Sequence, residues 1–344
     1  MSRGLGDVYK RQVYVGFAFN HHAKTYAGYH QIKSYISYDH YIDCQKEKNF
    51  VDKVIKRKWL IDRIYIKVFG PRLWRSELKC IFYSLFHKHI TFHIIYGENI
   101  LKYLYLFRKQ NHIVSTFHLP YELISKNKDY CNAIKHSQKV IILTQKDLLQ
   151  IKKIKGDENV FYIPHGISTS FYKPGEIKRN PKHLLMVGNM LRNFQLANTI
   201  FNKLLDRDNT LSITIVTQLY NHHYFTKRDR LILLHDISNK SLLNLYQTVS
   251  LLILPMYSFT ANNALLEALS CGCHVHIISD RIDNSYQTNN VITHTSAKNI
   301  QESIDFIENY IENFKDDSYS VRESIIKKYS WEVIADQVYK LLQQ

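Results

Sequence analysis

The stretch Pro255-Met-Tyr-Ser-Phe-Thr-Ala-Asn-Asn-Ala-Leu-Leu-Glu-Ala-Leu-Ser-Cys-Gly272 carries the strongest structural signal in the chain. It follows an apolar strand predicted over residues 250–254, and a polar turn leads into a helix that begins at Asn262 or Asn263 and ends at Gly272. The first N–H groups of a helix lack intrahelical partners, and the helix dipole places about half a positive charge there. The pattern therefore predicts a helix start that binds an anion, typically a phosphate.

Within that helix, Asn263 and Glu267 lie one turn apart on one face, whereas Leu265, Ala268 and Leu269 form an apolar stripe. A carboxylate beside an anion site favours polar contacts, such as hydrogen bonds accepted from sugar hydroxyls. The alternative is a core helix with a solvated glutamate. The pattern alone leaves both interpretations open.

These residues resemble the donor-binding element of GT-B glycosyltransferases, in particular glycosyltransferase family 4. In that family two glutamates eight positions apart bracket the turn, and the second contacts the ribose of a nucleotide sugar. Glu267 matches the second, whereas Phe259 stands at the first, so Thr260 is the candidate for the missing contact to the transferred sugar. The resemblance implies that the donor is bound by the turn and the helix start, which are Thr260, Asn262, Asn263, Ala264, Leu265 and Glu267.

The length of 344 residues suits two α/β domains. With the resemblance, we expect the GT-B fold, in which two doubly wound Rossmann-like domains face a central cleft. No apolar run approaches the length of a transmembrane helix. The five cysteines show neither metal-ligand spacing nor a disulfide framework, which favours a reducing compartment, and we expect a cytoplasmic protein.

Charge is distributed unevenly along the chain. Residues 1–175 carry 29 Lys and Arg against 13 Asp and Glu, a net charge of +16, whereas residues 176–344 carry 17 of each. A basic half that faces an anionic partner explains this better than genomic bias, which should affect both halves.

The chain is expected to divide as follows. Residues 1–12 have no apolar period; we expect them to be disordered, and they look like a translated cloning or assembly artefact. An N-terminal acceptor-binding domain over 13–167 ends in Ile-Pro-His-Gly-Ile, which resembles the Ile-Pro-Asn-Gly-Val of the family. A linker over 168–183 leads to a nucleotide-sugar-binding domain over 184–328, and 329–344 form a helix that packs back across the domains.

In the first domain, apolar segments at residues 13–19, 93–96, 113–117, 140–143 and 160–163 alternate with helical stretches, which predicts a parallel sheet. Gly28 loosely matches the small residues that face the donor phosphates in the family. His118 follows a predicted strand, and the carboxyl ends of such strands bind ligands. The resemblance makes His118 and Glu267 the candidate catalytic residues, although a lone histidine is usually structural.

The second domain opens with a strand over 184–187, followed by Gly188 and Asn189, which the resemblance makes candidate donor-binding residues. The family places an Arg and a Lys after this glycine, both on the diphosphate. Arg192 supplies one cation with bidentate geometry, and no Lys follows within the loop. Asp236 precedes a helix predicted over 240–248 and matches a loop that borders the nucleotide base.

Residues 46–79 mix basic and aromatic side chains, among them Lys56, Arg57, Lys58, Trp59 and Trp74. This mixture is typical of a surface that lies on anionic lipid headgroups. The alternative is an amphipathic helix pair with a solvated basic face, and both remain open.

The resemblance predicts a retaining, metal-independent glycosyltransferase without a cofactor. It would move a sugar from a nucleotide sugar to a glycan or lipid-linked acceptor. A second class is a GT-B protein that binds a nucleotide sugar or an anionic glycan without turnover, as Phe259 and the missing Lys suggest. A nucleic-acid binder is disfavoured because the basic residues match no reader motif.

Overall fold

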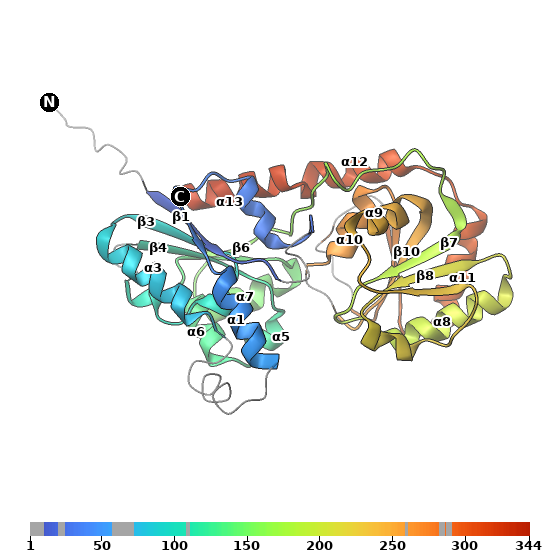
Figure 1. Ribbon diagram of the computed structural model, residues 1–344, viewed down its shortest axis with the longest axis horizontal. Helices are drawn as coiled ribbons and strands as arrows, with labels where there is room; N and C mark the ends of the chain where they lie inside the picture. Colours follow the sequence, from blue (N-terminus) through green and yellow to red (C-terminus); the bar gives the residue numbers. More distant parts are fainter. Residues whose placement is uncertain are drawn as a thin grey trace. The chain divides into compact units, whose positions relative to one another are not determined.

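The computed structural model describes residues 10–19, 25–56, 72–107, 111–258, 261–281, 286 and 291–344. The chain divides into two compact units (Figure 1). Unit 1 contains Met1–Gly166 with Ile334–Gln344, and unit 2 contains Ile167–Val333. No helix in the described ranges is both long and apolar enough to cross a bilayer.

Unit 1 is built on a six-stranded parallel sheet. In spatial order its strands are β2 (His40–Asp43), β1 (Arg11–Gly16), β3 (Ile90–Ile94), β4 (Asn111–Phe117), β5 (Lys139–Ile142) and β6 (Val160–Tyr162). Its helices are η1 (Tyr29–Ser34), α1 (Gln45–Lys56), α3 (Trp74–Phe86), α4 (Gly97–Ile100), η2 (Leu104–Phe107), α5 (Tyr121–Ile124), α6 (Lys128–His136), η3 (Gln145–Asp147), α7 (Leu148–Lys155) and most of α13 (Trp331–Gln343). The strand order reverses between β1 and β3, which are neighbours.

The core of unit 1 surrounds this sheet. All of β3 is buried, and so is β1 from Gln12 onward. Continuous burial of this kind is typical of parallel strands covered on both faces. The end of the chain completes the unit, because α13 buries Ile334, Val338 and Leu342, and the Nζ atom of Lys139 donates to the Leu341 carbonyl at 2.9 Å.

Unit 2 contains a second six-stranded parallel sheet. In spatial order its strands are β12 (Ile292–Thr295), β11 (His274–Ile278), β10 (Val249–Pro255), β7 (Asn180–Val187), β8 (Ser212–Val216) and β9 (Leu231–Leu234). Its helices are α8 (Phe194–Arg207), η4 (Leu219–Tyr224), α9 (Asn239–Thr248), α10 (Asn263–Ser270), α11 (Ile300–Glu312) and α12 (Ser318–Tyr329). The order reverses between β7 and β10, so the unit is doubly wound.

The two faces of the second sheet have separate hydrophobic cores. Leu185 and Val187 of β7 pack with α10, α12 and the end of α9, whereas Leu184 and Met186 pack with α8 and α11. Alternate side chains of a strand point to opposite faces, so a strand buried on both sides serves both cores. These cores fix β7 and β10 in the centre of the unit.

Some boundaries differ from those expected from sequence. β1 begins at Arg11, inside the predicted leader, and residues 1–9 lie outside the described part. β7 begins at Asn180, inside the predicted linker, because backbone pairing of Asn180 with Val249 extends the strand through polar residues. Tyr172, also assigned to the linker, is buried in unit 2.

Candidate donor-binding site

The candidate site lies in unit 2 where the strand order reverses. The loops that follow β7 and β10 leave the carboxyl ends of adjacent strands, and this edge is where doubly wound sheets bind ligands. The loops also hold each other: the N–H of Tyr257 donates to the Leu191 carbonyl at 3.0 Å, and that of Asn193 donates to the Pro255 carbonyl at 2.9 Å. The site therefore has a defined backbone frame.

Gly188 allows the guanidinium of Arg192 to lie against the backbone at the end of β7. Its φ angle is 125°, a conformation that favours glycine. A Cβ atom at this position would lie 2.5 Å from Nη2 of Arg192. Any larger residue would therefore displace the arginine.

Arg192 is a buried cation, and its side chain is 8% exposed. Its Nε donates to the Val187 carbonyl at 3.0 Å, and its Nη2 donates to Oδ1 of Asn262 at 3.3 Å. Burial lowers the pKa of Arg192 to about 10, so it remains charged at neutral pH. Among the described residues no carboxylate forms an ion pair with it. An uncompensated buried cation is costly, and an anionic ligand would compensate it.

The start of α10 faces the same loops. Asn262 is its N-cap, because its Oδ1 accepts from the N–H of Leu265 at 3.4 Å, and its own N–H donates to the Tyr286 hydroxyl at 3.1 Å. The Oδ1 of Asn263 is buried without a hydrogen-bond partner. Ala264 and Leu265 are buried in the first turn. Thr260, together with Phe259, lies outside the described residues.

Glu267 differs from the sequence expectation of a polar face, because residues 264–270 are all buried and only Asn263 of α10 is partly exposed. The Oε2 of Glu267 accepts from the Tyr246 hydroxyl at 2.9 Å, and Tyr172 supplies a second hydrogen bond. Burial raises the pKa of Glu267 to about 7, although both hydrogen bonds lower it. The predicted contact of this carboxyl with a ribose thus stays a prediction, and the two tyrosines fix its orientation.

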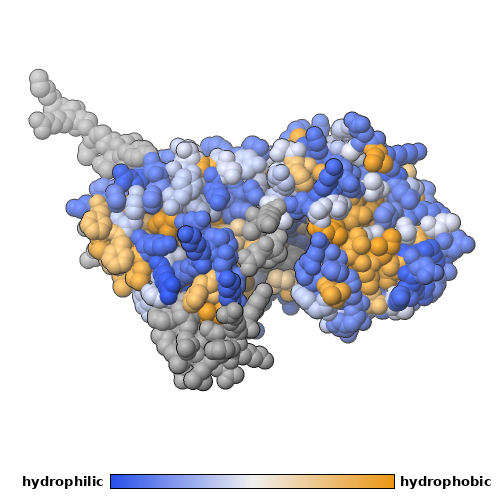
Figure 2. All heavy atoms as spheres, in the orientation of Figure 1, coloured by the Kyte–Doolittle hydropathy of each residue, from blue (hydrophilic) through white to orange (hydrophobic). Residues whose placement is uncertain are grey.

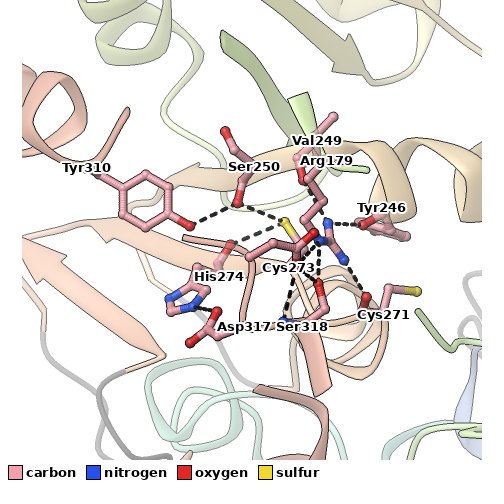
Figure 3. Close-up of polar contacts among 11 residues, drawn as sticks. Arg179, Tyr246, Val249, Ser250, Cys271, Cys273, His274, Tyr310, Asp317 and Ser318 are labelled. Atoms are coloured by element: carbon pink, nitrogen blue, oxygen red, sulfur yellow. Dashed lines mark hydrogen bonds and ion pairs between the residues drawn. The ribbon is translucent and has the colours of Figure 1, made fainter. Parts of the chain in front are cut away.

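Arg179 stabilises the opposite end of α10 (Figure 3). Its guanidinium donates to the carbonyls of Tyr246 and Val249, each at 2.7 Å, to the Cys271 carbonyl and to the Ser318 hydroxyl. A cation at the last carbonyls of α9 and α10 complements both helix dipoles. Sequence reasoning missed Arg179, Tyr246 and Tyr172, because their contacts join distant segments that no local motif marks.

Two further predicted donor residues lie at the same edge of the sheet. The Oδ1 of Asn189 accepts from the Thr217 hydroxyl at 2.9 Å and from the N–H of Gln218 at 2.7 Å, so it ties the β7 loop to the end of β8. Asp236 follows β9, is exposed and has a φ angle of 50°. The structure thus brings Gly188, Arg192, Asn262 and Asn263 together, and Asp236 lies beyond β8 at the edge strand.

Unit 1 contains the second predicted catalytic residue. His118 follows β4, and its Nε2 lies 2.8 Å from the Ile95 carbonyl. Its ring contacts Tyr96 and Tyr29 at centroid distances of 4.5 and 5.0 Å. Burial lowers the pKa of His118 to about 3, so the ring is neutral, Nε2 carries the proton and Nδ1 is an acceptor.

Near His118 lies Glu98, which sequence reasoning did not single out. One carboxyl oxygen is 3.4 Å from the backbone nitrogen of His118, the other is buried without a partner, and burial raises the pKa of Glu98 to about 8.

An open pocket of about 750 Å³ lies at the carboxyl ends of β1 and β2 and includes Tyr14 and His30. The Tyr14 hydroxyl and Nδ1 of His30 are buried without partners. Gly28, with a φ angle of 101°, precedes η1, which carries His30.

The residues predicted to contact a membrane are mostly outside the described part of the chain. Arg57, Lys58 and Trp59 fall there, and so does the side chain of Lys56. Trp74 begins α3, is half-buried and packs its ring 5.3 Å from the guanidinium of Arg75.

Comparison with known proteins gives similarity in structure only. No family model and no curated protein matches the sequence. Among solved structures, a glycosyltransferase from Rickettsia africae is similar with a TM-score of 0.66 and 15% identity, over 97% of this chain and 98% of that one. HepE of Anabaena, solved in complex with UDP and glucose, has a TM-score of 0.65 and 11% identity, over 98% and 100%.

TarM of S. aureus is similar with a TM-score of 0.64 and 16% identity. The match covers 78% of this chain and 58% of TarM, so this chain spans little more than half of TarM. At identities this low the likenesses show the fold alone. Together with the two parallel six-stranded sheets, they confirm the predicted fold class, GT-B.

Proposed function

We propose that the protein is a cytoplasmic glycosyltransferase resembling family 4, which moves a sugar from a nucleotide-sugar donor to a glycan or lipid-linked acceptor, with retention and without a metal. The observation that carries this proposal is Arg192, a buried cation with no carboxylate partner among the described residues, beside the start of α10. Both features favour a diphosphate. The solved structure of HepE, in complex with UDP and glucose, supports a nucleotide-sugar donor.

Transfer forms a bond between an acceptor hydroxyl oxygen and the anomeric carbon and breaks the bond from that carbon to the diphosphate. Negative charge develops on the diphosphate, which can take up the proton that the acceptor hydroxyl loses. Arg192 and the helix start are placed to stabilise that charge without reorganisation. Glu267, oriented by Tyr246, is assigned to the ribose hydroxyls. In unit 1, Nδ1 of neutral His118 can accept a hydrogen bond from a sugar hydroxyl, and the pocket with Tyr14 and His30 is the candidate acceptor site.

The second candidate function is binding of a nucleotide sugar or anionic glycan without turnover. Three observations favour it: Glu267 already has two tyrosine partners, Phe259 replaces the first family glutamate, and no Lys follows Gly188 within the loop. Both functions use the same donor site. They differ only in whether the sugar leaves the nucleotide.

The test is a screen of nucleotide sugars for thermal stabilisation, followed by an assay for nucleotide release. A ligand at 100 times its Kd adds about 2.7 kcal/mol to the unfolding free energy. Stabilisation with nucleotide release supports the transferase, and stabilisation without release supports the binding protein. If no nucleotide sugar or diphosphate stabilises the chain while RNA or DNA binds in a salt-sensitive way, both proposals are wrong.

A further inference from the structure

Helix α3 exposes a stripe of large apolar side chains on unit 1. Leu78, Phe82, Leu85 and Phe86 are 39%, 59%, 59% and 82% exposed. At the helical rotation of about 100° per residue, all four fall within a sector of about 100°. Figure 2 shows hydrophobic side chains gathered on the surface where Figure 1 labels α3. The opposite face of α3 is buried and includes Cys80 and Ser84.

The exposed side of α3 carries cations but no carboxylate. Arg75 and Lys79 are exposed; by the same rotation Arg75 lies within the sector of the stripe, about one turn before Leu78, and Lys79 lies at its margin. The one acidic residue of the helix, Glu77, is 3% exposed. Its Oε1 accepts from three N–H groups at 2.6, 2.5 and 2.8 Å, those of Lys102, Tyr103 and Leu104. The negative charge is therefore turned inward, and the outer surface is both apolar and basic.

The net charge of the unit identifies the kind of partner. Unit 1 has 29 Lys and Arg against 14 Asp and Glu, a net charge of +15, whereas unit 2 has 17 against 16, a net charge of +1. A second copy of this chain would carry the same cations on this face and the same net charge of +15 on unit 1, so the two surfaces would repel each other. An anionic bilayer accepts both the cations and the apolar side chains.

We propose that the α3 stripe, formed by Leu78, Phe82, Leu85 and Phe86 with Arg75 and Lys79, docks unit 1 on an anionic lipid surface. This interaction goes beyond the proposed transfer reaction and does not depend on it. If the chain also catalyses the proposed sugar transfer, docking on a bilayer favours a lipid-linked acceptor. This conclusion about the acceptor rests on the proposed function.

The test measures partition of the full chain onto phosphatidylglycerol-containing vesicles and onto phosphatidylcholine vesicles. We expect binding to the anionic vesicles that weakens as salt rises from about 0.1 to about 1 M, because the Debye length falls from about 10 to about 3 Å. Phe82→Ser with Phe86→Ser should lower the partition coefficient by about tenfold or more. Lys79→Gln should lower it about fivefold at low salt.

Matched controls lie on unit 2. Tyr319→Ser removes a side chain that is 76% exposed, and Lys327→Gln removes an exposed cation; neither should change partition. The proposal is overturned if the wild type ignores anionic vesicles, if the Phe82 and Phe86 substitutions leave binding unchanged, or if they instead dissociate a dimer in sedimentation velocity. Thermal stabilisation by a nucleotide sugar, measured on the same variants, reports on the proposed function separately.

Discussion

Glu267 binds its proton more tightly than an exposed glutamate, because its carboxyl group is buried between Tyr246 and Tyr172. Burial disfavours the carboxylate by more than the two hydrogen bonds favour it. At neutral pH the group is therefore near its midpoint. Such a residue responds to a small change in its surroundings, such as a hydroxyl that donates a further hydrogen bond.

The raised pKa of Glu267, about 7 against an ordinary 4.5, predicts a pH dependence of stability. The folded state holds the proton more tightly, so this stabilisation is complete below about pH 4.5 and is lost as pH rises through 7. Between about pH 5 and pH 8 the wild type should lose about 2 to 3 kcal/mol relative to Glu267→Gln. Urea unfolding at both pH values measures this. The exposed Glu323→Gln is the control, and a constant difference between wild type and Glu267→Gln would contradict the prediction.

Arg192 offers a second test at the scale of a single residue. Arg192→Lys keeps the charge but loses the planar guanidinium that bonds the Val187 carbonyl and Asn262. We expect the affinity for a nucleoside diphosphate to fall about tenfold or more, because a charged hydrogen bond contributes about 1.5 to 3 kcal/mol. Calorimetric titration measures it. Arg207→Lys, at an exposed arginine paired with Glu308, should bind like the wild type; equal affinities of the two variants would place the anion site elsewhere.

At the scale of the element, polar contacts at both ends of α10 hold the helix in position. Asn262 caps the start beside Arg192, and Arg179 binds the Cys271 carbonyl at the other end. The helix is short and buried from Ala264 to Ser270, so the polar contacts at its ends decide its position.

A substitution at the N-cap Asn262 should affect the stability of the fold and the affinity for a diphosphate differently. Asn262→Asp keeps a good cap and places a carboxylate beside Arg192, so the fold should be as stable or more stable. A bound diphosphate would then meet a negative charge, and its affinity should fall about tenfold or more. Asn299→Asp makes the same change at the N-cap of α11, where no such cation lies among its hydrogen-bond partners. If both variants keep full diphosphate affinity, α10 does not bind the anion.

The sequence predicted several elements that bury an apolar run, although β11, with four of its five residues buried, was not among them. β10 was expected over 250–254 and spans Val249–Pro255, because all seven residues are buried. β2 was missed, since only Ile42 of its four residues is buried and its polar pattern resembles a loop. β7 begins in polar residues that pair only through their backbone.

The candidate site was predictable where its residues follow a strand end or a helix start. Arg192 and Asn262 are such residues, and the structure brings them to 3.3 Å. The tyrosine that holds Glu267 was not predictable, because it lies on another helix, 21 residues earlier in the chain. Helical periodicity assigns a face to Glu267 but does not say what covers that face.

At the scale of the whole molecule, the two units do not simply follow each other along the chain, because unit 1 is made of two separate segments. Unit 2 is one continuous segment that contains both of its hydrophobic cores, whereas unit 1 takes its last helical turns from the end of the chain. The basic charge belongs to unit 1, whereas Gly188, Arg192, Asn262 and Glu267 of the candidate donor site lie in unit 2. Damage to one unit should therefore leave the other largely unchanged.

Deletion of 334–344 tests this independence. The segment buries Ile334, Val338, Leu341 and Leu342, and their loss should cost unit 1 about 6 kcal/mol or more, comparable to the stability of a whole domain. Hydrogen exchange should accelerate in β1, β3 and β4 but not in β7 and β10, and a nucleoside diphosphate should still bind. Deletion of only Gln343 and Gln344, both exposed, is the control. Equal loss of protection in both sheets would show that the units unfold together, since unit 2 keeps all of its own core residues in the truncated chain.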